Sequence, residues 1–303
     1  MKNKGYIFSF LLLGFAVGVL FVTLLSNKKV SGFSFDPVQQ SIRGIRINQA
    51  ITFAGEPIPI NSDDISERLE RELLINTYQH SSTLICLKLA NRYLSQVAAI
   101  FKEEGLPEDL KYIAVAESAL RNAVSSAGAK GIWQFKEATA LEMGLTVNDY
   151  IDERNNFEKC THAAAKYLRN LHERFGTWAL ACAAYNMGPS ALSVAMAEQK
   201  EKSFFDLNLS EETNRYLFRI LAYKEIMSNP DKFGYILDKS DLYPEYKSYS
   251  VVKVDSSINS LADFAHRNGI TYRDLKLYNP WLLKSSLINK NKAVYEIRIP
   301  SEL

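Results

Sequence analysis

Cysteine and histidine are scarce in this 303-residue chain, which has three cysteines and four histidines. Cys86, Cys160 and Cys182 form no C-x-x-C pair and allow at most one disulfide, and none of the histidines lies in an H-E-x-x-H motif or another metal-binding spacing. In helical-looking stretches, small buried thiols are commoner than ligands. The sequence therefore predicts neither a metal centre nor another cofactor.

An excess of charge of one sign is also absent. Thirty-six lysines and arginines face 34 acids, which gives a formal net charge of +2 at pH 7. A nucleic-acid partner would require a basic footprint, and none is present. No feature points to a particular protein partner. The 47% hydrophobic and 23% charged composition suits a globular core and more than one domain.

The N-terminus carries the one long uncharged run. Residues 5–27 have no charged side chain, and two lysines precede and two follow them. This length can cross a bilayer, and no A-x-A-like cleavage site or lipid-attachment cysteine is evident. We expect residues 1–27 to be an inner-membrane anchor, with the remaining chain periplasmic or otherwise extracytoplasmic. The lysines on both sides give little orientation signal, and cleavage of the anchor stays open.

The remaining chain divides by pattern into a linker, a helical domain and a small tail. Residues 28–60 mix polar residues, glycine and proline without a helical period and read as a linker with a short strand at most. Residues 61–236 follow helical patterns. The tail, 247–303, reads as strand, two short helices and strand, a β-α-α-β unit. The predicted fold class is mainly α with a small α+β tail. The helical stretches are expected at 62–78, 82–104, 107–121, 157–175, 177–185 and 210–228.

Glu117 stands in an otherwise small or apolar run, "YIAVAESAL". At 3.6 residues per turn it shares one face with Leu110, Ile113 and Leu120, so the pattern places it against the core. A desolvated carboxylate has a raised pKa and can keep a proton near neutral pH, as a general acid must. An exposed or lysine-paired glutamate at a misjudged helix angle is the alternative.

Two further segments carry residue types that suit a sugar site. "GAKGIWQF" (128–135) combines two glycines, which allow close backbone approach, with aromatic rings and the amide of Gln134. The alternative is that this segment is a tight turn whose two aromatic residues pack in the core. "WALACAAYNMGP" (178–189) ends in a helix stop, which by itself accounts for Asn186, Gly188 and Pro189.

Taken together and in this order, the segments resemble the soluble-lytic-transglycosylase domain of the lysozyme superfamily, in the branch of membrane-bound lytic murein transglycosylase D. The resemblance covers roughly residues 53–227. Glu117 and Ser118 match the Glu-Ser motif, residues 131–135 match Gly-Leu-Trp-Gln-Phe, residues 184–188 match Ala-Tyr-Asn-x-Gly, and Tyr216 matches the tyrosine of the fourth motif. Lys136 and Glu137 depart from the usual Met-Pro.

The resemblance implies a lysozyme-like helical catalytic domain that acts as a lyase on peptidoglycan glycan strands. It implies cleavage of the β-1,4 bond between N-acetylmuramic acid and N-acetylglucosamine, with a 1,6-anhydromuramyl end. By this resemblance, Glu117 is the single catalytic carboxylate, which acts first as the general acid and then as the general base. Tyr216 orients Glu117, and Asn186 offers a dipole to developing charge. The residues carried over as substrate-contacting positions are Ser118, Ser125, Gln134 and Tyr185.

Three alternatives stay open. A second carboxylate, Glu137 or Glu142, would suit a water-using muramidase, although both fall on what reads as a solvated helix face. A protein of this fold that binds the wall without cutting it is the other reading, and Glu117 argues against it. The tail weakly resembles a LysM module, which binds N-acetylglucosamine-containing glycans, and a small packing domain without glycan affinity is equally compatible with it.

Overall fold

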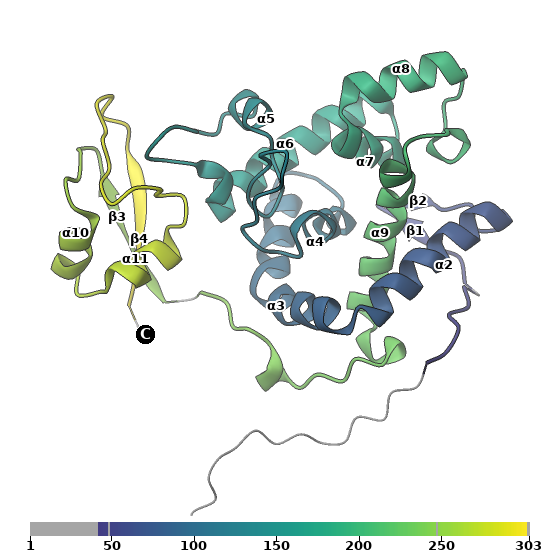
Figure 1. The fold of residues 1–303 in the computed structure, drawn as a ribbon, viewed down its shortest axis with the longest axis horizontal. Coiled ribbons are helices and arrows are strands. Elements are labelled where there is room, and N and C mark those ends of the chain that lie inside the picture. The colour runs from purple at the N-terminus through teal and green to yellow at the C-terminus, as the bar shows by residue number, and fades with distance from the viewer. Residues whose placement is uncertain (1–41, 48, 247, 302–303) are drawn as a thin grey trace, which may run out of the picture. The chain divides into compact units, whose positions relative to one another are not determined.

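The computed structural model describes residues 42–47, 49–246 and 248–301, and most of them belong to helices (Figure 1). Asn156 and Gly176 show why one helix has its bounds: the Asn156 side chain accepts a hydrogen bond from the Lys159 amide, and Gly176 adopts φ +81° at the other end. The mainly helical fold class is confirmed. The α-helices up to residue 228 are α2 (Asp63–Tyr78), α3 (His80–Glu103), α4 (Tyr112–Ser118), α5 (Glu137–Glu142), α6 (Phe157–Phe175), α7 (Trp178–Met187), α8 (Pro189–Gln199) and α9 (Glu211–Ser228).

Short 3-10 helices join these elements. They are η1 (Glu108–Lys111), η2 (Glu153–Asn155), η3 (Phe204–Asp206), η4 (Pro230–Phe233) and η5 (Lys239–Asp241). The sequence pattern predicted that a helix stops at Pro189, but it did not predict that a new helix, α8, begins there. Proline lacks an N–H and is well suited to the first helical position, so it opens α8 directly after Gly188 ends α7.

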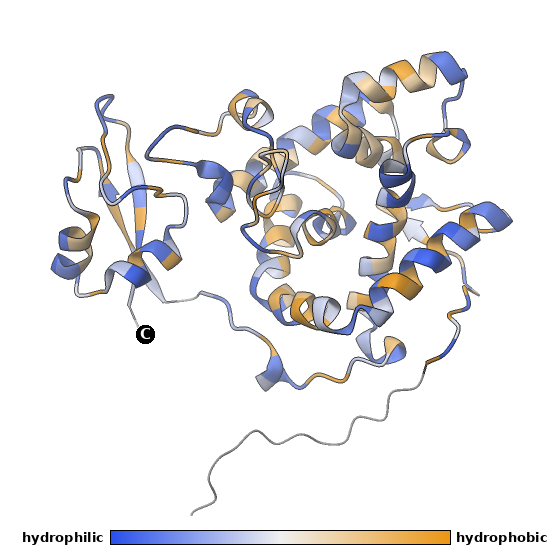
Figure 2. Ribbon diagram, viewed as in Figure 1, coloured by the Kyte–Doolittle hydropathy of each residue, from blue (hydrophilic) through white to orange (hydrophobic). Residues whose placement is uncertain are grey.

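Helix α7 lies at the centre of the main hydrophobic core. Every residue from Trp178 to Ala184 is buried, as expected for a helix that is apolar all round. Helix α9 packs against α2, α4 and α7. Hydrophilic and hydrophobic residues alternate along α2 and α9 in Figure 2, which agrees with one buried and one solvated side on each helix. Cys86, Cys160 and Cys182 are buried, as predicted, and all three are free, so the one disulfide that the sequence allows is not formed.

Part of the expected linker belongs to this core. Residues 52–53 (β1, Thr52–Phe53) pair antiparallel with β2 (Glu56–Pro57), Thr52 opposite Pro57 and Phe53 opposite Glu56. Ile51, Phe53 and Ile58 are buried among the helices. A two-residue strand with no alternation gives no sequence signal, so the pattern alone could not place this segment in the core.

The tail forms the predicted β-α-α-β unit around its own hydrophobic cluster. Its elements are β3 (Tyr249–Val254), α10 (Leu261–Arg267), α11 (Tyr272–Tyr278) and β4 (Tyr295–Pro300). The two strands pair antiparallel, from Tyr249 opposite Pro300 to Val254 opposite Tyr295. The cluster also contains Ile151, which lies outside the tail in sequence and is 1% exposed.

Backbone hydrogen bonds hold the segment around Ile151 against the tail. The Asp152 amide donates to the Trp281 carbonyl at 2.9 Å, and the Leu283 amide donates to the Tyr150 carbonyl at 2.8 Å. These contacts lie within residues 45–303, which form one compact unit. The tail is therefore docked on the segment that precedes α6.

The predicted anchor, residues 1–27, lies outside the described residues. Within the described part of the chain, helix α3 alone has the length and apolar composition that could cross a membrane. Its buried residues, among them Leu94, Val97 and Phe101, belong to the main core. The core helix of a soluble protein passes the same test, so α3 is explained by packing.

Candidate active site

Glu117 lies in the last turn of α4, because the helix ends earlier than its pattern predicts. The sequence favours a helix from Pro107 to Arg121, whereas the structure has η1 followed by α4, which stops at Ser118. Ala119 and Leu120 have φ values of +53° and +59°, a left-handed conformation that cannot continue the helix. The chain turns away after Ser118, and the Glu117 side chain keeps partial access to solvent.

The hydroxyl of Tyr216, on α9, donates a hydrogen bond to Glu117 Oε1 at 2.5 Å. Tyr216 is 1% exposed, so its ring fixes the direction of this hydrogen bond. Desolvation raises the pKa of Glu117 from its ordinary 4.5 to about 7, although the Tyr216 hydroxyl acts in the opposite direction by stabilising the carboxylate. Near neutral pH the carboxyl group is therefore divided between its protonated and ionised forms.

Nearby charges have a smaller influence on this pKa. Arg219 lowers the pKa of Glu117 and Glu212 raises it. Arg219 Nη1 lies 3.0 Å from Glu212 Oε1, and Arg219 Nε lies 3.7 Å from Oε2 of the buried Glu72. Because each charge already has an opposite charge beside it, their effects on Glu117 are reduced, and desolvation remains the largest influence.

Two hydroxyl groups fasten the Gly128–Phe135 turn beside Glu117. Ser118 Oγ donates to the Ile132 carbonyl at 2.9 Å, and the Tyr185 hydroxyl donates to the Trp133 carbonyl at 2.7 Å. Trp133 is fully buried and its indole N–H donates to Thr161 Oγ1 at 3.0 Å. Ser118 is itself buried, so in this structure its hydroxyl supports the turn and does not face solvent.

The other predicted site residues also hold backbone in place. Ser125 Oγ accepts a hydrogen bond from the Ala129 amide at 3.0 Å, inside the turn. Gln134 has φ +49° and its Nε2 donates to the Ala123 and Gly131 carbonyls at 3.1 and 2.7 Å. Gln134 thus closes the turn through its amide nitrogen, which leaves Oε1 without a hydrogen-bond partner among the described residues.

Asn186 stands at the end of α7. Its Oδ1 accepts a hydrogen bond from the Thr213 hydroxyl at 2.8 Å, which orients the side-chain amide. Its Nδ2 has no hydrogen-bond acceptor within the described part of the chain. Met187, next to it, packs against the main core, as the sequence indicates.

A buried ion cluster behind the turn was not predicted from the sequence. Asp152 is 1% exposed, and its Oδ2 lies 2.7 Å from Arg154 Nη2 and 3.0 Å from Lys130 Nζ. Arg154 Nη1 donates to the Gly128 and Phe135 carbonyls at 3.2 and 3.3 Å. The pKa of Asp152 is lowered because hydrogen bonds from both cations outweigh its desolvation. Arg154 therefore connects both ends of the Gly128–Phe135 turn to the Asp152 carboxylate.

Gly131 fits against this cluster because it has no Cβ. Its φ is +81°, and a Cβ placed on it would lie 1.9 Å from the Arg154 carbonyl oxygen. No larger residue fits without moving backbone. The charged residues of this cluster are visible in the sequence as "DER" at 152–154. No spacing rule, however, predicts that they contact a turn some 20 residues earlier in the chain.

Neither Glu137 nor Glu142, the two candidates for a second catalytic carboxylate, contacts Glu117. Glu137 and Glu142 are both exposed, as their helical pattern indicates. Within the described residues no group of three histidine, cysteine or acidic side chains could hold a metal ion. The site is built from one titrating carboxyl group, hydroxyl groups and amides.

The chain matches two protein-family models. Residues 89–208 match the transglycosylase SLT domain, and residues 250–303 match the soluble lytic transglycosylase C-terminal LysM-like domain. Residues 89–208 are an SLT domain. The SLT match contains Glu117 and all the other predicted site residues except Tyr216, which lies beyond its end. Tyr216 nevertheless hydrogen-bonds Glu117 directly, so α9 contributes a contact to Glu117 from outside the matched residues.

Two curated relatives are similar in sequence to this chain. The chain is 31% identical over 236 residues to membrane-bound lytic murein transglycosylase D of Escherichia coli K12, which covers 76% of this chain and 50% of that protein. It is 36% identical over 126 residues to peptidoglycan transglycosylase gp16 of Escherichia phage T7, covering 40% of this chain and 10% of that protein. The chain thus spans half the length of the first relative.

A solved structure is also similar. The 70 kDa soluble lytic transglycosylase of Escherichia coli matches 44% of this chain and 24% of its own chain, with 22% identity and a TM-score of 0.38.

Proposed function

We propose that this chain is a peptidoglycan lytic transglycosylase. In this proposal it cleaves the β-1,4 bond between N-acetylmuramic acid and N-acetylglucosamine and leaves a 1,6-anhydromuramyl end. The observation that carries the proposal is the Glu117 carboxyl group, which has a pKa of about 7 and a fixed hydroxyl partner in Tyr216, inside an SLT domain. A general acid and base works best when its pKa lies near the working pH.

One carboxyl group suffices for both proton transfers. Protonated Glu117 gives its proton to the glycosidic oxygen as the bond to the muramyl anomeric carbon breaks. The resulting carboxylate then takes the proton of the muramyl 6-hydroxyl, whose oxygen closes on the same carbon. Glu117 ends protonated again and no water is consumed. Tyr216 holds Oε1, so Oε2 is the oxygen that we assign to the travelling proton.

The cation-like charge at the anomeric carbon needs stabilisation without a second carboxylate. The substrate's own acetamido group is placed to supply it in substrate-assisted glycosidases. Asn186, whose amide is oriented by Thr213, adds a fixed dipole in our proposal. Gln134 offers its Oε1, and Ser125 and Tyr185 complete the walls of the site.

The wider setting is also part of the proposal. The first relative is named membrane-bound and acts, by its name, on murein. We propose that residues 1–27 anchor this chain to the inner membrane with the SLT domain on the periplasmic side, and that the tail adds affinity for glycan strands.

Release of soluble fragments from purified peptidoglycan tests the role of Glu117. Glu117→Gln keeps the shape of the side chain and removes its titrating proton, so the rate should fall by about 10² to 10⁴. Glu137→Gln, which changes an exposed glutamate on α5, is the matched control and should keep the wild-type rate. Undiminished release by a folded Glu117→Gln protein would rule out this function.

A further inference from the structure

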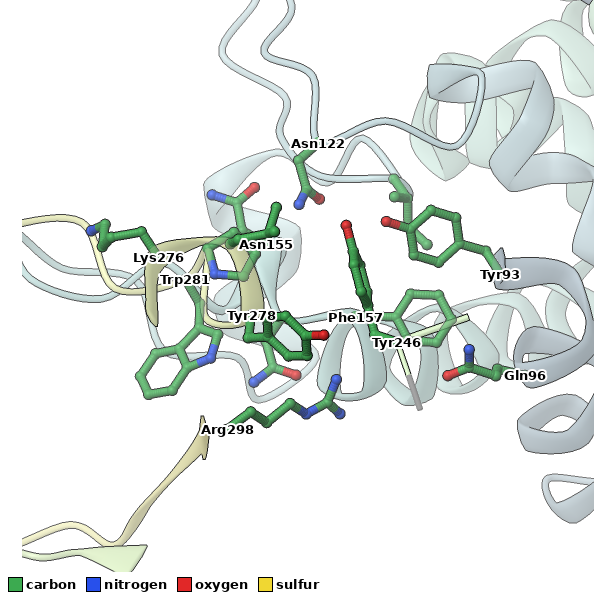
Figure 3. A pocket seen from close by; sticks show the side chains of 14 residues that line it. Tyr93, Gln96, Asn122, Asn155, Phe157, Tyr246, Lys276, Tyr278, Trp281 and Arg298 are labelled. Carbon is green, nitrogen blue, oxygen red and sulfur yellow. The ribbon is translucent and has the colours of Figure 1, made fainter. Parts of the chain in front are cut away.

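A cavity outside the candidate active site lies where the tail meets the helical domain. It has a volume of about 220 Å³ and is lined by α3, the residues just before α6, α11 and β4 (Figure 3). None of the predicted catalytic or substrate-contacting residues lines it. Ile132 links it to the candidate active site, because Ile132 lines the cavity and its carbonyl accepts the Ser118 hydrogen bond.

Aromatic rings form much of this lining. The Tyr93 and Phe157 rings lie 5.2 Å apart, and the Tyr246 and Tyr278 rings lie 4.9 Å apart. All four are partly exposed, and Figure 3 shows the three tyrosines around the cavity. Flat rings with a polar edge suit a pyranose, which has an apolar face and a rim of hydroxyl groups.

Side-chain amides with unused hydrogen-bonding capacity accompany the rings. Asn122 and Asn155 line the cavity, and neither side chain forms a hydrogen bond with another residue in the described part of the chain. Gln96 donates through Nε2 to the Arg92 carbonyl at 2.7 Å, which leaves the Gln96 Oε1 available to accept a hydrogen bond from a ligand. An amide can both donate to and accept from an acetamido or hydroxyl group.

The charge at the cavity is positive. Lys276 Nζ donates to the carbonyls of Leu282 and Lys284, and no described carboxylate pairs with it. Lys276 is partly buried, and this burial lowers its pKa. Arg298, by contrast, is already paired with Glu158 and lies 4.6 Å from the Tyr249 ring centroid. Figure 3 shows the Lys276 side chain extending away from the tyrosine rings, so its ammonium group lies at the outer end of the cavity lining, where it can pair with an anionic substituent of a ligand.

We propose that this cavity is a second saccharide site, which holds one N-acylated sugar ring whose carboxylate pairs with Lys276. The volume is below the roughly 300 to 1,000 Å³ of pockets that enclose drug-sized ligands, so it suits one ring of a longer chain. This rests on the proposed function, since a muramyl unit carries both an acetamido group and a carboxylate. A strand held here is held beside the turn that contains Ile132.

Titration calorimetry in the full-length Glu117→Gln protein tests the proposal without turnover. The ligands are an N-acetylglucosaminyl-N-acetylmuramic acid disaccharide with a free lactyl carboxylate, the same disaccharide with a peptide stem, and chitobiose, which has no carboxylate. Lys276→Met should weaken one binding event by roughly 10- to 100-fold, the loss expected for a charge-assisted hydrogen bond, for a carboxylate-bearing ligand only. Lys290→Met, an exposed lysine outside the cavity, is the control and should change nothing.

The two carboxylate ligands separate the sources of the charge. An effect with the free lactyl group alone assigns that carboxylate to Lys276, and an effect with the peptide-bearing ligand alone assigns a stem carboxylate. Asn122→Ala, which alters an exposed side chain and leaves the fold unstrained, should weaken chitobiose and both muramyl ligands alike. Equal affinities in the parent, Lys276→Met and Asn122→Ala proteins would overturn the proposal, as would a Lys276→Met effect that is the same for chitobiose. Because cleavage is not measured, these outcomes are independent of whether Glu117 is catalytic.

Discussion

Replacing Glu117 by glutamine should change how the stability of the protein depends on pH. The pKa of Glu117 is about 7 in the folded chain and 4.5 ordinarily, so the folded state binds this proton more tightly than the unfolded state does. The stabilisation is fully present below pH 4.5 and is lost as the pH rises through about 7. At about 1.36 kcal/mol per pKa unit, the loss is about 3 kcal/mol.

Urea unfolding at about pH 4 and about pH 8 measures this effect, because the glutamine variant lacks the titration. The free energy of unfolding of Glu117→Gln minus that of wild type should be about 3 kcal/mol larger at the higher pH. Glu137→Gln, on an exposed glutamate, should show no such difference between the two conditions. If the Glu117→Gln difference is the same at both pH values, Glu117 is not desolvated as described and the acid-base argument fails.

Three further perturbations test the site and its support. Tyr216→Phe removes the hydroxyl that stabilises the Glu117 carboxylate, so the pKa of Glu117 and the matching limb of the kcat/KM pH profile should rise by about one pH unit; an unmoved limb would contradict the contact. Gly131→Ala places a Cβ against the Arg154 carbonyl and should lower the free energy of unfolding by about 3 kcal/mol or more, so a wild-type urea midpoint would refute the close packing. Ile151→Ala opens a cavity in the tail cluster and should destabilise the chain by about 2 to 5 kcal/mol in urea; a change below 1 kcal/mol would show that the segment is not docked on the tail.

The elements with local end signals could be predicted well from the sequence. Helix α6 has the predicted bounds because Asn156 caps its start and Gly176 its end. Helix α9 begins after Ser210, whose hydroxyl accepts from the Thr213 amide, as its position before two acids indicates. The placement of Glu117 near the core also followed from periodicity, since α4 is α-helical from Tyr112 through Ser118.

Features that depend on contacts between distant segments could not be predicted in this way. Ala119 and Leu120 take left-handed conformations that neither residue type favours, so the end of α4 has no local signature. The contacts of Arg154 with the Gly128–Phe135 turn and of Ile151 with the tail cross long stretches of sequence. Propensity and periodicity describe neighbours in the chain and carry no information on such pairs.

The mass of the muramyl ends in a wild-type digest tests the central claim most directly. If the 6-hydroxyl closes on the anomeric carbon after Glu117 has protonated the glycosidic oxygen, mass spectrometry will show ends about one water lighter than hydrolysis gives, and the ends will resist borohydride reduction. A Glu117→Gln digest run in parallel should give almost none of them, consistent with the loss of about 10² to 10⁴ in rate. Reducible muramyl ends of full mass would contradict the account and identify a hydrolase.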